Sequence, residues 1–406
     1  MMKSKVILLL MAVAGLTSIG LTSCGDDDDF TASIFDTKEY PLDRSLYTFP
    51  LDTFVKKNFL EPYNLKFIYR MEDIGSDLQK NLTPAKYEQS VKLAVLAKYL
   101  WYDVYKKYGT EVFLKENSPR IIHVIGSKNY NPSQGTEVLG VAEGGLKITL
   151  YNTNQLNEND IDMMNEYFFK TMHHEFGHIL DQTHLRPTEF NLLSAGHYDA
   201  AGWQETPDSL SAGNGFVTPY ASSATGEDWV ETLANFITRD SISWERLLGS
   251  ASYDWEQIDI DNRTDYTKQL VGVYDIDTIG YLNDRAQNGD LKIYRRVCAR
   301  NADGTVALKD GKVEWLHRSG IDGKATILKK LELVQNWMQQ YYGMSIYDLR
   351  REVQQRQYVT RPDGTFVLDQ YGDFINNLTH PVSEGSSETV IESLLKEVEQ
   401  YKSLMK

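Results

Sequence analysis

The sequence predicts an α+β fold, in which a mixed sheet and its helices are followed by a mostly helical C-terminal region. Segments with alternating polar and apolar residues, which are typical of strands, occur between segments whose apolar residues recur at helical spacing. The chain has 406 residues, of which 41% are hydrophobic and 24% are charged, as in ordinary globular proteins. This length is enough for about two or three domains with sizeable cores.

The elements of the first half are predicted from residue patterns and turn signals. A helix over 51–59 precedes a strand over 65–71, where polar and apolar residues alternate. A longer helix is predicted to begin with Thr83 as its N-cap and Pro84 at its first position, and to continue to about residue 108. Further strands are predicted over 120–125, 138–143 and 146–151, with a tight connection at Gly144 and Gly145.

The residues that carry chemistry are concentrated in the segment 172–184, MHHEFGHILDQTH. His174 and His178 are four residues apart, so on a helix both imidazoles lie on one face and can bind one metal ion. This is the HExxH pattern of zinc enzymes. Glu175 is rotated by about 100° around the helix from His174, so it is the expected general base for a water molecule beside the metal. The predicted cofactor is one catalytic Zn²⁺ ion.

A catalytic zinc ion usually has three protein ligands, and the first candidate for the third ligand is His184. It follows His178 by six residues, which is the spacing of the metzincin pattern HExxHxxGxxH. Asp181, however, stands where that pattern has a glycine that turns the chain sharply. His184 therefore remains an alternative ligand.

The second candidate is Glu227, in the segment TGEDWVETLANF (225–236). Thr225 and Asp228 form a predicted capping box, which indicates the start of a helix. Glu231 lies one turn after Glu227, so Glu227 could bind zinc while Glu231 orients a histidine ligand through its free N–H. This arrangement resembles that of the gluzincins. The resemblance to the lethal-factor type, whose zinc helix also reads HEFGH, implies that Tyr220 stabilises the transition state.

The first 23 residues have the pattern of a signal peptide, in which Lys3 and Lys5 precede an apolar run over 6–21. The sequence LTSC (21–24) resembles a bacterial lipobox, which implies that Cys24 is lipidated and becomes the N-terminus. The acidic residues 26–29 resemble the surface-export signal of lipoproteins from bacteria of the Bacteroidetes type; the alternative is a solvated spacer. We therefore expect a lipidated tether over 24–50 and a surface-exposed outer-membrane lipoprotein, with the lipid as its membrane anchor.

Several segments together resemble one family: 53–73, the helix after Pro84, HEFGHILDQT, GHYDAAGW (196–203) and EDWVETLANF. They resemble the zinc metallopeptidase lipoproteins encoded beside SusC/SusD-type uptake systems, also called substrate import-associated zinc metallohydrolase lipoproteins. The resemblance covers about residues 1–245 and 322–357. It implies a zincin-like catalytic domain over 51–245 and an uptake complex of the SusC/SusD type as a partner. An insertion or loop-rich segment over 246–320 and a helical C-terminal region over 321–406 complete the predicted organisation.

The predicted function is that of a surface-anchored zinc hydrolase, most simply a peptidase acting on peptides or proteins. In zincins an extended substrate commonly pairs with an edge strand, which either 138–143 or 146–151 could provide. The alternative is a zinc-containing lipoprotein that binds its substrate without cutting it, and a third reading is hydrolysis of an amide in a modified glycan. The net charge of −15 disfavours a nucleic-acid partner, because phosphate binding needs clustered Lys and Arg.

Overall fold

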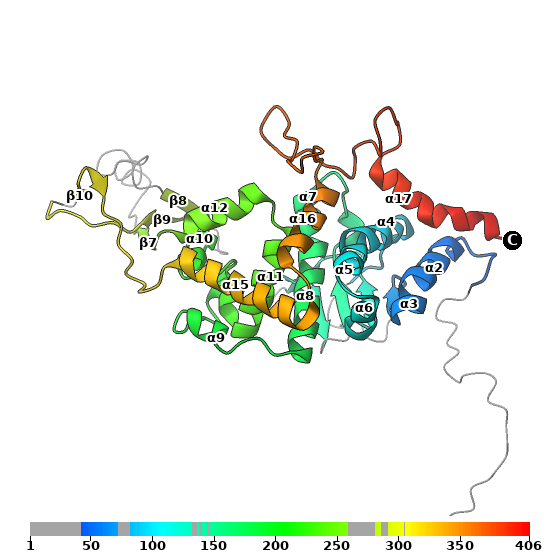
Figure 1. The fold of residues 1–406 in the computed structure, drawn as a ribbon, viewed down its shortest axis with the longest axis horizontal. Helices are drawn as coiled ribbons and strands as arrows, with labels where there is room; N and C mark the ends of the chain where they lie inside the picture. The colour runs from blue at the N-terminus through cyan, green and yellow to red at the C-terminus, as the bar shows by residue number, and fades with distance from the viewer. Residues whose placement is uncertain are drawn as a thin grey trace, which may run out of the picture. The chain divides into compact units, whose positions relative to one another are not determined.

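A four-stranded mixed sheet packs against helix α8 (Lys170–Thr183), which carries the HExxH pattern (Figure 1). The strand order is β1–β2–β6–β5, in which β1, β2 and β6 run parallel and β5 runs antiparallel at one edge. The mixed sheet and the abundance of helices confirm the predicted α+β class. The strands of this sheet are β1 (Lys66–Ile68), β2 (Ile121–Val124), β5 (Gly140–Glu143) and β6 (Lys147–Leu150).

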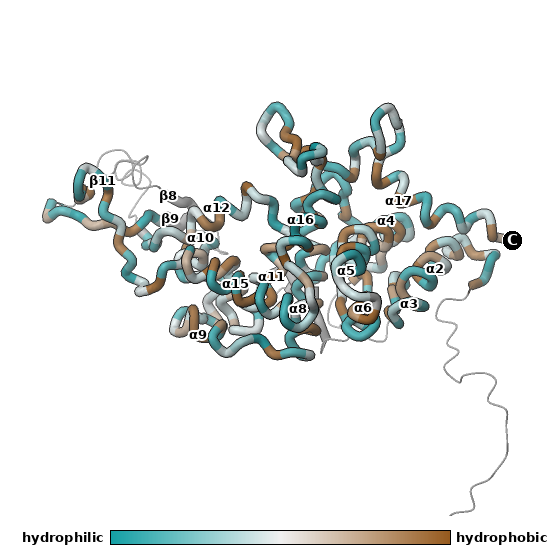
Figure 2. The backbone as a smooth tube through the Cα atoms, in the orientation of Figure 1, coloured by the Kyte–Doolittle hydropathy of each residue, from teal (hydrophilic) through white to brown (hydrophobic). Residues whose placement is uncertain are grey.

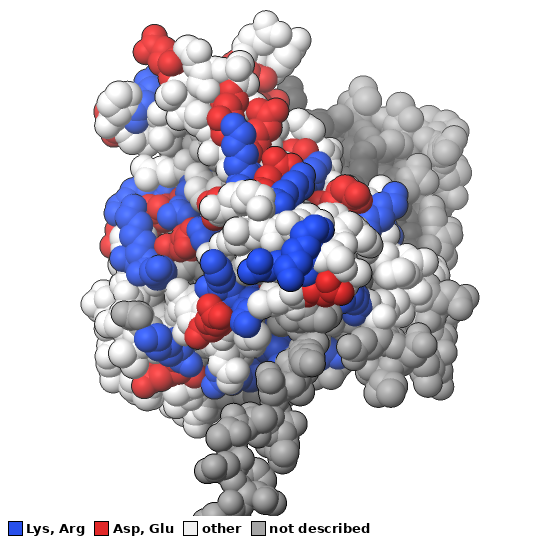
Figure 3. Space-filling model, turned by 90° about the vertical axis from the view of Figure 1, so that its right-hand side faces the viewer, with Lys and Arg blue, Asp and Glu red and all other residues white. Residues whose placement is uncertain are grey.

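The computed structural model describes residues 42–71, 82–131, 136–138, 140–143, 147–258, 281–285, 291–303 and 305–406. The expected signal peptide, Cys24, the acidic residues 26–29 and most of the expected tether lie outside these ranges. Within the described part of the chain, no helix is long and apolar enough to cross a membrane. On the face drawn in Figure 3, acidic and basic side chains are interspersed rather than gathered into a single patch.

The predicted N-terminal helices form, but the longest of them begins later than its sequence indicates. The chain is helical from Tyr87 to Tyr108, and Lys86 precedes the first turn without capping it through its side chain. The prediction of Thr83 as N-cap is wrong, because Pro84 is held in a bridge with Ile125. The helices here are α2 (Phe49–Val55), η1 (Lys56–Leu60), α3 (Glu61–Tyr63), α4 (Tyr87–Ala97), η2 (Lys98–Tyr102), α5 (Asp103–Tyr108) and α6 (Glu111–Asn117).

Helix α8 packs directly against helix α11 (Thr225–Thr238), and this contact positions the predicted site. A Cβ atom added to Gly177 would lie 2.9 Å from Cγ1 of Val230, so glycine is needed for this close approach. The helix start at Thr225 is confirmed, but the predicted capping box is not formed. Ala224 is the N-cap and offers no side-chain acceptor. Ahead of α8 the chain forms α7 (Ile161–Met164) and η4 (Asn165–Phe169).

Two C-terminal helices cover α11 from the other side, so that α11 is buried along most of its length. The rings of Trp229 on α11 and Trp337 on α15 meet edge to face at 5.1 Å. The hydrophobic residues of α4 and α11 stand out in Figure 2. The remaining helices are α9 (Phe190–Leu193), η5 (Trp203–Glu205), α10 (Asp208–Gly213), η6 (Tyr220–Ser223), α12 (Ser241–Ala251), α15 (Gly323–Tyr342), α16 (Ile346–Gln357), α17 (Val390–Glu399) and η8 (Gln400–Leu404).

Short strands occur in the described part of the segment that was expected to be an insertion, and one turn of this segment recurs further along the chain. In the first copy the amide of Asn301 donates to the carbonyl of Thr305 at 2.9 Å, and in the second Arg361 donates to Thr365 at 2.8 Å. Segments 299–314 and 359–375 therefore share one meander pattern. The small sheets comprise β3 (Asn129–Asn131) with β4 (Thr136–Val138), β7 (Trp255–Ile258) with β9 (Leu291–Arg296) and β8 (Tyr281–Arg285), and β10 (Leu308–Lys309) with β11 (Lys312–Val313).

Candidate metal centre

Three of the predicted ligands converge on one point between α8 and α11. His174 and His178 lie one turn apart on α8, and Glu227 comes from the first turn of α11. The Oε2 atom of Glu227 is 3.2 Å from Nε2 of His174 and 3.4 Å from Nε2 of His178. Among the described residues, these three form the cluster of metal-ligating side chains, with candidate ligand atoms all within 4.8 Å of one another.

The geometry of this cluster fits a zinc ion. Bonds of 2.0–2.2 Å arranged tetrahedrally place neighbouring ligand atoms about 3.3–3.6 Å apart. The separations from Oε2 of Glu227 to the two imidazole nitrogens, 3.2 and 3.4 Å, lie at the short end of that range. This oxygen is buried and makes no hydrogen bond in the described structure, so its lone pairs are available to a metal.

Glu231 fixes the orientation of His174. Its Oε1 atom lies 2.7 Å from Nδ1 of His174, so an N–H at Nδ1 donates to the carboxylate and Nε2 is left for the metal. The other carboxylate oxygen accepts hydrogen bonds from Thr218 Oγ1 at 2.6 Å and from Asn235 Nδ2 at 3.1 Å. These two neighbours were not predicted. Asn235 lies one helical turn after Glu231, which is a spacing that could have pointed to it.

The carboxylates give the cluster a strong preference for positive charge. Burial lowers the pKa of His174, but the adjacent Glu227 and Glu231 outweigh it and raise that pKa to about 10. Burial raises the pKa of both carboxyl groups, but the neighbouring histidines, His174 above all, hold it well below the usual range. A site that stabilises a proton on buried imidazole in this way is also suited to a bound cation.

Glu175 lies beside the cluster without belonging to it. Its side chain is buried, and burial raises the pKa of its carboxyl group even though His174 and His178 oppose that shift. A raised pKa favours a carboxylate that must accept a proton and later release it. The structure therefore places Glu175 in an environment suited to the predicted role of general base.

Tyr220 covers the cluster from η6. Its ring stacks on that of His174 with centroids 5.9 Å apart. The ring of Trp203 meets the Tyr220 ring edge to face, with centroids 4.9 Å apart. Burial raises the pKa of the Tyr220 hydroxyl, and the nearby Glu227 raises it further, so the hydroxyl keeps its proton. A protonated hydroxyl at this position can donate a hydrogen bond toward the cluster.

His184, the alternative ligand, does not join the cluster. It ends helix α8, and its ring stacks on that of Tyr341 with centroids 4.4 Å apart. Asp181, which stands in place of the metzincin glycine, instead accepts hydrogen bonds from the backbone and guanidinium of Arg186. Arg186 also donates to Thr225 Oγ1 at 3.1 Å, so it connects the end of α8 to the start of α11.

Comparison with known proteins identifies a zinc-binding family. The model of the family described as "Putative zinc-binding metallo-peptidase" matches residues 46–347. The chain belongs to this family. A crystal structure of "a putative zinc-binding metallo-peptidase from Bacteroides caccae" is 32% identical, with a TM-score of 0.53, and the alignment covers 76% of this chain and 91% of the other. Among curated proteins the comparison finds no match.

The match to the metallo-peptidase family extends through the whole of α15, which supplies a buried cation next to the metal cluster. Nζ of Lys330 lies 2.6 Å from Oδ2 of Asp228, and both side chains are fully buried. Tyr198 donates a hydrogen bond to the same carboxylate at 2.8 Å, and Lys330 donates to the carbonyl of Gly215 at 2.7 Å. Because Asp228 adjoins Glu227, this ion pair anchors the ligand-bearing turn of α11. Sequence reasoning did not find Lys330, although the apolar Ile327 and Val334, three and four residues away, could have marked its position as buried.

His173 precedes the ligand His174 on α8 and contacts a different part of the molecule. Its side chain is fully buried, and Nδ1 lies 2.9 Å from the hydroxyl of Tyr105 on α5. Burial lowers the pKa of His173 to about 3, so the imidazole is neutral. It connects α8 to the N-terminal helices and lies outside the ligand set.

Proposed function

We propose that this protein is a zinc-dependent peptidase in which Glu175 acts as the general base. The observation that carries the proposal is the His174, His178 and Glu227 cluster, with a buried carboxylate of raised pKa beside it. When bound, a zinc ion would supply Lewis-acid chemistry, which polarises a carbonyl group and lowers the pKa of water to about 7. Glu175 would accept a proton from the attacking water at its carboxylate and later give it to the leaving amine nitrogen.

Tyr220 and strand β5 complete the proposed mechanism. Tyr220 would donate its hydroxyl hydrogen bond to the carbonyl oxygen as negative charge develops there, which is when such a donor contributes most. Both candidate strands contact α8, but β6 pairs with a strand on each side, whereas β5 lies at the edge of the sheet. An extended peptide could pair with the free edge of β5, the strand that contacts the helix carrying His174 and His178. This supports a peptide or protein as the substrate.

The test is digestion of a mixed peptide library by the purified zinc-loaded chain, with products identified by mass spectrometry. We expect cleavage that stops when a chelator removes the metal. Glu175→Gln should keep its zinc and lose about 10²–10⁴-fold in rate, because proton transfer by a positioned carboxylate contributes that much. Glu189→Gln, which changes an exposed glutamate away from the cluster, is the matched control and should cleave normally.

Two outcomes would contradict the peptidase proposal. Cleavage that survives both the chelator and Glu175→Gln would mean that the chemistry lies elsewhere. Chelator-insensitive binding of peptides without any products would favour the alternative, a zinc-containing protein that holds its ligand without cutting it.

We also propose that the protein is a lipoprotein on the surface of the outer membrane and serves a SusC/SusD-type uptake complex. The support is the lipobox-like sequence that ends at Cys24, the acidic residues 26–29 and the resemblance to proteins of such systems. The related crystal structure comes from Bacteroides caccae, which is consistent with the expected surface-export signal of bacteria of the Bacteroidetes type. Labelled palmitate should be incorporated into the wild-type protein and not into Cys24→Ala. Failure of the protein to co-purify with any SusC/SusD-type complex would contradict the proposal that such a complex is its partner.

A further inference from the structure

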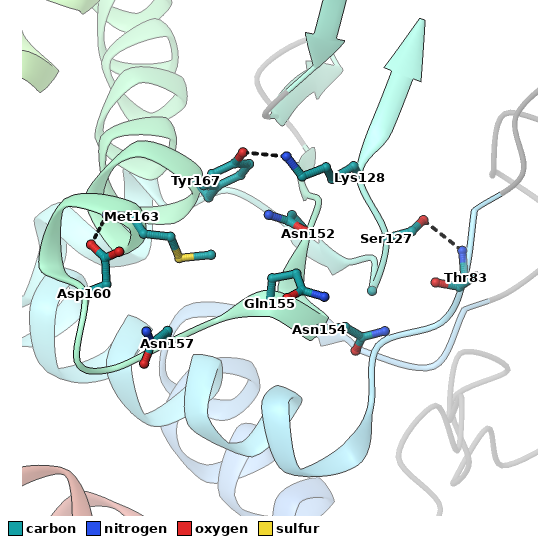
Figure 4. Close-up of a pocket in the computed structure, with 11 residues that line it drawn as sticks. Thr83, Ser127, Lys128, Asn152, Asn154, Gln155, Asn157, Asp160, Met163 and Tyr167 are labelled. Atoms are coloured by element: carbon teal, nitrogen blue, oxygen red, sulfur yellow. Dashed lines mark hydrogen bonds between the residues drawn. The ribbon is translucent and has the colours of Figure 1, made fainter. Parts of the chain in front are cut away.

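A polar pocket of about 670 Å³ lies at the carboxyl ends of the parallel strands β2 and β6 (Figure 4). Its walls come from residues 126–128 after β2, from 152–157 after β6, and from 160–167 ahead of α8. Ligands of open sheets bind outside the carboxyl ends of parallel strands, and ligand pockets usually measure about 300–1,000 Å³. The pocket shares no residue with the metal cluster.

Asn152 is the residue that points to a ligand. It is only 4% exposed, yet its side-chain amide makes no hydrogen bond within the described structure. Its backbone adopts a left-handed conformation with φ of 63°, fixed by a hydrogen bond from its N–H to the carbonyl of Ser127 at 2.8 Å. Figure 4 shows the amide directed into the pocket, between Tyr167 and Gln155. Because this amide faces the pocket and has no protein partner, a ligand bound there would gain hydrogen bonds from it.

The walls around Asn152 are held by hydrogen bonds of their own. Asn154 accepts from the amide of Lys86 at 2.8 Å, and Ser127 accepts from the amide of Thr83 at 3.0 Å. The exposed Gln155 has no hydrogen bond to its side chain within the described structure and faces the same space. The pocket is therefore formed in advance and offers two amide groups to a ligand.

The chemistry of the lining indicates what kind of ligand fits. Each amide offers both a donor and an acceptor, as hydroxyl groups require. The two charged groups already have partners: Lys128 donates to the hydroxyl of Tyr167 at 2.9 Å, and Asp160 accepts from the amide of Met163 at 2.8 Å. The ring of Tyr167 and the side chain of Met163 add apolar surface. The lining therefore carries one positive and one negative charge and no net charge. A pocket that combines amides, apolar surface and balanced charges is suited to a neutral ring with hydroxyls at its edge and C–H groups on its faces.

We propose that this pocket binds a neutral saccharide. The pocket is separate from the metal cluster. Tyr167, which lines the pocket, precedes the metal ligand His174 by seven residues, which is about 10 Å along a helix. A peptidase with such a site would be retained on glycosylated substrates. That consequence rests on the proposed peptidase function, whereas saccharide binding does not.

The test is a printed array of neutral oligosaccharides, with sialylated glycans and peptides as comparison spots, probed with the zinc-loaded chain. The best neutral oligosaccharide is then titrated by calorimetry. Asn152→Gly should weaken its binding by at least about tenfold, because two hydrogen bonds to a buried amide are lost. Glycine tolerates the left-handed conformation, so the variant should fold and keep its zinc.

Asn64→Gly is the matched control, because Asn64 is also left-handed, with φ of 55°, but lies outside the pocket at the end of α3. It should bind the oligosaccharide as the wild type does. Asn152→Asp, which keeps the shape and loses the donor, provides a second variant and should also weaken binding. The proposal is overturned if no neutral oligosaccharide binds, if only sialylated glycans or peptides bind, or if both Asn152 variants bind normally. Each of these outcomes is read from binding alone and leaves the peptidase proposal standing.

Discussion

Replacing Lys330 by methionine should destabilise the protein strongly, because it leaves a buried carboxylate without its cation. Nζ of Lys330 lies 2.6 Å from Oδ2 of Asp228, and neither side chain is exposed to solvent. Removing one partner of a buried ion pair costs about 3–5 kcal/mol, and a typical free energy of unfolding is only about 5–15 kcal/mol. Methionine fills similar space, so the loss reports the charge rather than a cavity. The free energy of unfolding is measured by urea denaturation followed by tryptophan fluorescence.

Lys329→Met is the control, because this neighbour on the same helix makes only surface ion pairs, the shorter being 3.3 Å from Glu332. It should change the free energy of unfolding by less than about 1 kcal/mol. Adding Asp228→Asn to Lys330→Met should recover part of the loss, since the unpaired charge is then gone. The reasoning is refuted if Lys330→Met costs no more than the control, or if the second substitution brings no recovery.

Three further predictions concern single side chains. Glu231→Gln should weaken zinc binding about 10–100-fold in a competition assay with a chelating dye, because His174 loses the carboxylate that orients it. Gly177→Ala should lower the free energy of unfolding by about 1–3 kcal/mol in urea titrations, because the new methyl group would lie 2.9 Å from Val230. Burial raises the pKa of Glu352, but hydrogen bonds from a lysine and an arginine outweigh it and hold that pKa below 4.5. The stabilisation of the folded protein by ionised Glu352 is therefore complete above the unfolded-state pKa and is lost as the pH falls through the folded-state pKa. Glu352→Gln should accordingly make the free energy of unfolding depend less steeply on pH on the acid side.

Different results would count against each of these. Unchanged zinc affinity in Glu231→Gln would mean that His174 is oriented by something else. A stabilised Gly177→Ala would show that helix propensity outweighs the contact between α8 and α11. An equally steep acid transition in Glu352→Gln would assign that transition to other carboxyl groups.

The sequence predicted the helices well where their signal comes from the residues that pack. Helix α11 starts at Thr225 as expected, because its apolar face decides where it lies. Local capping signals were less reliable. Pro84 matches the first position of a helix, but a bridge to Ile125 holds it outside, and the helix begins at Tyr87. A tertiary contact of this kind leaves no mark on the local pattern.

The candidate site was predictable to the extent that its residues lie at fixed helical spacings. His174 and His178 lie one helical turn apart, and so do Glu227 and Glu231. Two short segments were therefore enough to propose four residues of the site. Lys330 could not be found in this way. It reaches Asp228 from a helix about 100 residues further along. The apolar residues around it, Ile327 and Val334 among them, indicate a buried helix face but not the partner that Lys330 meets there.

The central claim is that two histidines of α8 and one glutamate of α11 bind a single zinc ion. The most direct measurement is zinc content per chain by mass spectrometry of the wild type, Glu227→Ala and His184→Ala, each purified in parallel. The account predicts one zinc per chain in the wild type and in His184→Ala, and loss of zinc from Glu227→Ala. Full occupancy in Glu227→Ala together with loss from His184→Ala would contradict it.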